Sequence, residues 1–217
     1  MHALLSQEQT VSPVYSIDTQ ANVLSQIYNL NTVLACYCCK SSWALSTAAK
    51  KYAQHSQGEL IRYQGGINPK LYTEVEQLFN KAAHGDLIST HIKQMLSMFE
   101  VLFEPKEIGI RVISCDHAIS PAFHKNTMIT RMASSVGGTG EQWIEHSNAT
   151  FLPLVDGQLT HQIKPPEDHV INHFCDGDIA IYKGTNWLAQ EHNALITSSP
   201  AFINQDPRIC IYIDYIC

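Results

Sequence analysis

The chain of 217 residues is predicted to fold as an α+β protein, with helices in its first half and short strands in its second half. Two observations lead to this prediction. Apolar residues recur at helical spacing up to residue 103, and beyond residue 105 short apolar segments alternate with clusters of turn-forming residues. Helices followed by many short strands indicate a sheet that closes into a sandwich or a barrel.

Capping residues mark the expected starts of the first two helices. Asp18 precedes a helical segment over residues 21–28. Ser41 or Ser42 precedes a segment over 43–55 that is rich in Ala, Leu and Lys, residues that favour helix.

Two further helices are expected before residue 105. Asn68-Pro69 places a proline in the first turn of a helix over 71–83, and His84-Gly85-Asp86 ends it. Residues 87–103 then carry apolar side chains at an amphipathic spacing near 3.6.

The expected strands are short and apolar, and turn clusters separate them. They cover residues 32–38, 108–113, 128–136, 178–182 and 208–215. We expect one domain over residues 1–217, with a mainly helical part (1–105) and a β-rich part (106–217), because nothing near Pro105 reads as a linker.

Composition restricts the function classes. A formal net charge of −6 argues against sequence-independent nucleic-acid binding, which needs a dense Lys/Arg surface. No segment approaches the ~18 apolar residues of a membrane span. The N-terminus lacks the features of a signal peptide, so we expect a cytoplasmic protein.

The seven cysteines are expected to be reduced thiols in the core. A zinc site is the alternative, because Cys36-x2-Cys39 provides half of a common ligand pattern. A second Cys-x2-Cys is missing from the sequence, and the adjacent Cys38 and Cys39 face opposite ways in a strand. We therefore predict no zinc site there.

His124 and Asn126 are the residues that carry most functional information. At positions i and i+2 of an extended segment they face the same side and can enter one pocket. Metal-dependent oxygenases use His-x-Asp or His-x-Glu with a distant His, and here an amide replaces the carboxylate.

Several segments in the second half resemble, in order, a bacterial family of domains of unknown function, number 1826 in that series. They are Ser120–Asn126, Arg131-Met132, Gly138, Gly140, Trp143-Ile144, Gly177–Trp187, Thr197–Pro200 and Arg208–Asp214, with a weaker match at Asn29–Cys36.

The resemblance implies a double-stranded β-helix (jelly-roll, cupin-like) core on which the N-terminal helices pack. It also implies a facial-triad metal site with an arginine that holds an acidic co-substrate such as 2-oxoglutarate. Members of the family are associated with zinc homeostasis.

This sequence departs from the family pattern at two of the three expected ligands. Asn126 stands where Asp is expected, and Thr197 stands where the second His is expected. An amide and a hydroxyl are weak ligands for Fe(II) or Zn(II). His192 can replace Thr197 only if the loop is rearranged.

Six residues are candidate ligand-binding residues, each with a structural alternative such as an ion pair or a buried hydrogen bond. They are His124, Asn126, Arg131, Lys183, Thr197 and Arg208. His124 and His192 are the candidate metal ligands. Arg131 and Arg208 suit a carboxylate, and Lys183-Gly184 is expected to form a turn in which the glycine supplies a positive φ.

Three functional hypotheses follow. The first is a cupin or oxygenase-like protein that binds a small acidic molecule and has a degraded metal site. The second is an active Fe(II)/2-oxoglutarate-type dioxygenase, with Fe(II) or another divalent metal as cofactor. The third is a non-enzymatic accessory protein in zinc homeostasis that acts through a protein partner. The sequence does not identify that partner.

Overall fold

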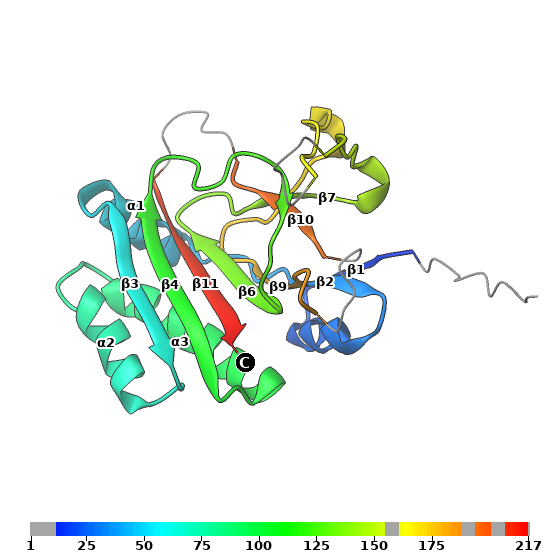
Figure 1. Cartoon of the computed structure of the whole chain (residues 1–217). Helices are drawn as coiled ribbons and strands as arrows, with labels where there is room; N and C mark the ends of the chain where they lie inside the picture. The colour runs from blue at the N-terminus through cyan, green and yellow to red at the C-terminus, as the bar shows by residue number, and fades with distance from the viewer. Residues whose placement is uncertain (1–11, 155–160, 188–193, 201–206, 217) are drawn as a thin grey trace, which may run out of the picture.

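The computed structural model describes residues 12–154, 161–187, 194–200 and 207–216, which form two β-sheets and a helical layer (Figure 1). The strands are β1 (Val14–Asp18), β2 (Thr32–Tyr37), β3 (Gly58–Gly65), β4 (Glu107–Cys115), β5 (His124–Lys125), β6 (Thr130–Val136), β7 (Gln142–Ile144), β8 (Asn172–His173), β9 (Ile179–Lys183), β10 (Ile196–Ser198) and β11 (Arg208–Ile216). The helices are the 3-10 helix η1 (Ala21–Tyr28), α1 (Trp43–His55), α2 (Pro69–Phe79), α3 (Gly85–Phe103), and the short 3-10 turns η2 (His146–Asn148) and η3 (Asp168–Val170).

The larger sheet has seven strands in the order β1-β2-β9-β6-β11-β4-β3. β1 pairs with β2 in parallel, and the other neighbours are antiparallel. The smaller sheet has the order β5-β10-β7-β8. Both halves of the sequence therefore contribute strands to the larger sheet.

Strand β11 shows why the larger sheet is buried on both faces. Ile211 and Ile213 belong to a hydrophobic cluster that also contains buried side chains of α1, α2 and α3. Cys210 and Tyr212, which point the opposite way, belong to a second cluster together with Trp143 of the smaller sheet. The strand reads as nearly continuous apolar sequence because helices cover one face and the smaller sheet covers the other.

The predicted helix starts at Ser42 and Asn68 are confirmed. The Ser42 hydroxyl accepts a hydrogen bond from the Leu45 amide at 3.1 Å, and the Asn68 Oδ1 accepts one from the Leu71 amide at 3.1 Å. Both bonds satisfy amides that have no partner within the helix. Pro69 occupies the first turn of α2, as expected.

Two expectations about the first half were wrong, and two strands were missed. Asp18 ends β1 and does not cap the next helix, which begins after Gln20 and is a 3-10 helix. Helix α2 ends at Phe79, four residues before the expected residue 83. Strands β1 and β3 were not expected, because their burial patterns are mixed and give no clean alternation of apolar and polar residues.

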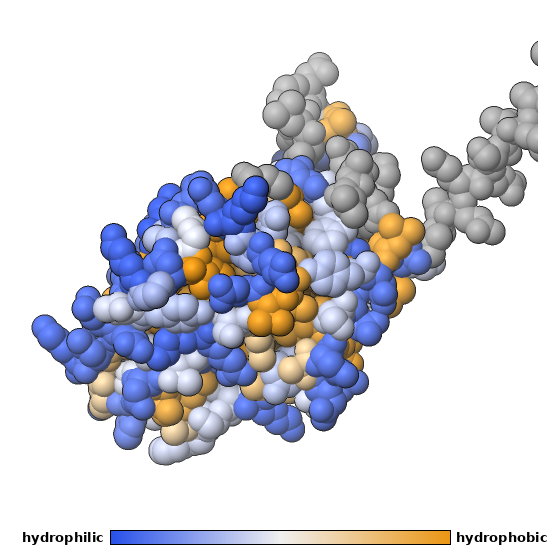
Figure 2. Space-filling model, turned by 90° about the horizontal axis from the view of Figure 1, so that it is seen from below, coloured by the Kyte–Doolittle hydropathy of each residue, from blue (hydrophilic) through white to orange (hydrophobic). Residues whose placement is uncertain are grey.

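The face seen in Figure 2 is mainly hydrophilic, with apolar patches between hydrophilic regions. The exposed large apolar side chains are Val14, Ile17, Tyr28, Leu30, Trp43, Val101, Phe151, Leu152 and Leu154. Among the described residues, none of the helices combines the length and the apolar character needed to cross a membrane.

Candidate functional site

The pairing of β5 with β10 brings the expected ligand positions together. His124 lies directly opposite Thr197 in this antiparallel pair. Thr197 is fully buried, and His124 is half-buried. Asn126 follows β5 by one residue, so its side chain is on the same side as that of His124.

Hydrogen bonds join these three side chains, which we call the His124 group. His124 Nε2 lies 3.3 Å from Asn126 Oδ1, and Asn126 Nδ2 donates to Thr197 Oγ1 at 3.0 Å. His124 Nδ1 lies 2.9 Å from the Ala122 carbonyl oxygen. Each ring nitrogen therefore faces an oxygen acceptor.

Arg131 connects the His124 group to β11. Its Nε and Nη2 donate to the two carboxylate oxygens of Asp214, each at 2.7 Å, and its guanidinium lies 4.9 Å from the centre of the Tyr212 ring. Its Nη1 is 3.5 Å from Asn126 Oδ1. This orientation of the Asn126 amide is the consistent one, since the reverse would place its NH2 against the Arg131 donor.

Glu141 is a residue that sequence reasoning missed. It lies just before β7, and its Oε2 accepts a hydrogen bond at 2.7 Å from the hydroxyl of Tyr182, which is fully buried in β9. Burial raises the pKa of Glu141, while the Arg131 charge and the Tyr182 hydrogen bond lower it in part. The sequence feature that could have pointed to Glu141 is its position directly after the glycine-rich turn at residues 137–140.

The contacts of Lys183 are to backbone carbonyl groups and to an aromatic ring. Its Nζ donates to the carbonyl oxygens of Asn29 at 2.9 Å and Leu30 at 3.2 Å, and it lies 4.9 Å from the centre of the Trp187 ring. Burial lowers the pKa of Lys183 to about 8. These contacts hold the end of β9 against the segment that follows η1.

The expected positive φ at Gly184 is wrong, because the positive-φ glycines among the described residues are Gly58, Gly65, Gly137 and Gly177. Gly184 is needed for a different reason. A Cβ at Gly184 would lie 1.9 Å from the Met128 carbonyl oxygen and 2.9 Å from that of Asn126.

Arg208 is buried, with 4% of its surface exposed, and its Nε donates to Cys210 Sγ at 3.4 Å. Cys210 Sγ is also 3.8 Å from Cys115 Sγ. Arg208 and Asp214, the partner of Arg131, are six residues apart on β11, about 20 Å along an extended strand. Arg131 and Arg208 therefore do not form a single clamp in this structure.

The donors of the His124 group do not fit a firmly held Fe(II) or Zn(II). They comprise one imidazole, one neutral amide and one hydroxyl, whereas these ions are held by several imidazole, thiolate or carboxylate ligands. The amide nitrogen and the hydroxyl also bond to each other. His192 lies outside the described residues.

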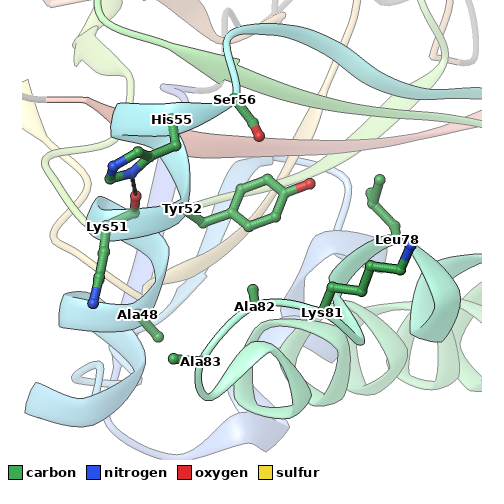
Figure 3. A pocket seen from close by; sticks show the side chains of 9 residues that line it. All are labelled: Ala48, Lys51, Tyr52, His55, Ser56, Leu78, Lys81, Ala82 and Ala83. Carbon is green, nitrogen blue, oxygen red and sulfur yellow. Dashed lines mark hydrogen bonds between the residues drawn. The ribbon is translucent and has the colours of Figure 1, made fainter.

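A separate surface hollow of about 380 Å3 lies on the helical side of the molecule. It is lined by Ala48, Lys51, Tyr52, His55, Ser56, Leu78, Lys81, Ala82 and Ala83, which come from α1 and from the end of α2 with the turn after it (Figure 3). His55 Nδ1 bonds to the Lys51 carbonyl at 2.8 Å, as expected for a helix end. None of the predicted site residues that the structure describes lines this hollow.

A family model described as "Protein of unknown function (DUF1826)" matches residues 18–214. The chain belongs to this family. The segments that carried the resemblance in the sequence all lie within the matched residues. No curated protein matches the chain.

Solved structures similar to this chain include three with low identity. The dioxygenase for auxin oxidation 1 from Arabidopsis thaliana, in complex with 2-oxoglutarate, is 11% identical with a TM-score of 0.39, over 72% of this chain and 61% of that chain. A putative oxygenase from Shewanella oneidensis is 9% identical with a TM-score of 0.42, over 94% and 90% of the two chains. The non-heme α-ketoglutarate-dependent epimerase SnoN from nogalamycin biosynthesis is 13% identical with a TM-score of 0.45, over 89% and 81%.

Proposed function

We propose that the chain is an oxygenase-like jelly-roll protein that binds a small acidic ligand beside the His124 group and has lost firm metal binding there. The observation that supports it best is the convergence of His124, Asn126 and Thr197, with Arg131 attached. Two of the three donor types differ from those that the family pattern leads us to expect. We include the expected cytoplasmic location in this proposal.

The hydrogen-bond donors beside the His124 group support an acidic ligand. Asp214 occupies Nε and Nη2 of Arg131, so the guanidinium is held in place with Nη1 directed toward Asn126. The contact from Nη1 to Asn126 is long, at 3.5 Å, and a carboxylate oxygen can replace it. His124 supplies a second donor when its Nε2 carries the proton.

An active Fe(II)/2-oxoglutarate dioxygenase is the less suitable alternative. Its chemistry needs an ion held by more than one strong donor, and the His124 group offers one imidazole. The alternative predicts stoichiometric Fe(II) that depends on His124.

Calorimetric titration tests the proposal. A panel of small carboxylates that includes 2-oxoglutarate is titrated into the protein with a chelator present. We expect one ligand per chain to bind, and His124→Ala and Arg131→Lys to weaken binding roughly tenfold. His117→Ala, an exposed histidine in the preceding loop, is the control and keeps parental affinity.

Two results would contradict the proposal. One is that no carboxylate of the panel binds. The other is that a carboxylate binds only in a parallel titration with Fe(II) and without chelator, which would indicate the active dioxygenase.

A further inference from the structure

A second group of ligand-type side chains lies at the ends of β2 and β9, away from the His124 group. Cys36 belongs to β2, Cys38 follows it, and Asp178 immediately precedes β9. One sulfur from each cysteine and one carboxylate oxygen of Asp178 all lie within 4.8 Å of one another. We call these three residues the Cys36 group.

The sheet register explains why these residues meet. Cys36 pairs with Ala180 and Tyr37 pairs with Ile179, so the same register continued by one residue places Cys38 opposite Asp178. Cys36 and Cys38 are two positions apart and share a face of the strand. The sequence pattern Cys36-x2-Cys39 drew attention to the wrong pair, because the pair that converges is Cys-x-Cys.

We infer that the Cys36 group is a binding site for a thiolate-preferring divalent ion of the zinc class. Two thiolates and a carboxylate are suitable ligands for Zn(II). In a tetrahedral site with Zn–S near 2.3 Å the donor atoms are separated by roughly 3.6–3.8 Å. The observed upper limit of 4.8 Å therefore requires only small side-chain movements.

A turn fixes the carboxylate in this group. The amide of Cys175 donates to Asp178 Oδ2 at 2.8 Å, as is usual for an orienting contact around a ligand. Gly177 has a φ of +87°, and a Cβ there would lie 2.7 Å from Ser41. The turn therefore packs directly on the segment that follows Cys38, and the two halves of the site are held together.

The electrostatics of the group favour a cation. Cys36 and Asp178 are buried, with 2% and 4% exposure, and in the described part of the chain no ion pair to Asp178 is found. A divalent ion would displace the two thiol protons into solvent and offset two of the three negative charges of the deprotonated group.

The test uses the full chain, stripped of metal and titrated with Co(II) and then with Zn(II). We expect one ion per chain, a sulfur-to-cobalt charge-transfer band in the near ultraviolet, and loss of that band when Zn(II) is added. Cys36→Ser, Cys38→Ser and Asp178→Asn should each weaken binding by at least roughly tenfold. Cys39→Ser and Cys115→Ser are matched controls and should leave it unchanged.

A measurement on the unmodified protein removes the dependence on variants that fail to fold. Bound Zn(II) should slow alkylation of Cys38, the more accessible of the two thiols, read by mass spectrometry, and leave the rate at Cys39 unchanged. The inference is overturned if no ion binds, if the Cys36→Ser/Cys38→Ser double variant binds as tightly as the parent, or if Zn(II) does not change the alkylation rate of Cys38.

Discussion

The candidate site combines residues that the sequence identified with residues that it could not identify. His124 and Asn126 were predictable because two positions of one strand always share a face. Asp214 and Glu141 were not, because each meets its partner across strands that lie far apart in the sequence. Arg131 was a candidate anion contact with a structural ion pair as the alternative, and its pairing with Asp214 shows that ion pair.

The ion pair between Arg131 and Asp214 should contribute strongly to stability. Both side chains are mostly buried, with 17% and 24% of their surfaces exposed. Asp214→Asn leaves the guanidinium without its counter-charge, so we expect a loss of roughly 3 kcal/mol in the free energy of unfolding. Urea unfolding measures it.

The exposed pair Arg111–Glu59 provides the control. Glu59→Gln should leave the unfolding midpoint nearly unchanged, because solvent screens exposed pairs. Equal effects of Asp214→Asn and Glu59→Gln would show that the buried ion pair contributes no more to stability than the exposed one.

His91 gives the protein a defined sensitivity to acid. It is buried in α3 beside Ser134, and burial lowers its pKa from 6.5 to about 4. Between these values the unfolded chain binds a proton that the folded chain does not. His91 therefore does not reduce the free energy of unfolding above about pH 6.5. As the pH falls toward about 4, the free energy of unfolding decreases by up to roughly 3 kcal/mol because of His91.

Chemical unfolding of His91→Gln across this pH window tests the assignment. The variant should lose most of the acid dependence that the parent shows, whatever its stability at neutral pH. His117→Gln, at an exposed position, should retain it. If the free energy of unfolding of His91→Gln depends on pH as strongly as that of the parent, other groups cause the acid sensitivity.

At the scale of elements, the predictions were correct where the local sequence dominates. Helices α1 and α2 begin where Ser42 and Asn68 cap them, and β11 coincides with its apolar run. Strands β5, β7, β8 and β10 have only two or three residues each, and pairing within the smaller sheet defines them. Such short strands carry no periodicity that a sequence pattern can reveal.

Gly184 links the fold to the site at this scale. A Cβ there would clash with the carbonyl oxygens of Met128 and Asn126, which are backbone atoms and cannot rotate away. Gly184→Ala should therefore destabilise the protein by several kcal/mol, on the order of a severe core mutation, and should displace Asn126.

Gly109→Ala is the matched control for this substitution. Its Cβ would meet the end of the flexible Ile216 side chain at 3.2 Å, so a small shift can accommodate it. Thermal unfolding of the two variants compares them directly. A Gly184→Ala protein as stable as Gly109→Ala would exclude the close approach as the reason for this glycine.

At the scale of the whole molecule, the α+β class was predictable and the sheet order was not. Strands β1, β2 and β3 from the first 105 residues join the same sheet as strands from the second half. Strand pairings of this kind depend on contacts between residues far apart in the chain, so the local sequence carries little information about them. The predicted jelly-roll core remains part of the proposed function.

The central claim is that the His124 group keeps its geometry but has lost its donors, so restoring the donors should restore the metal. The measurement is Fe(II) content after anaerobic reconstitution, made in a Cys36→Ser/Cys38→Ser background so that the Cys36 group does not contribute. We expect clearly less than one ion per chain with Asn126 and Thr197 present, and close to one ion in Asn126→Asp/Thr197→His. One tightly bound Fe(II) in the unrestored protein, removed by His124→Ala, would contradict the claim.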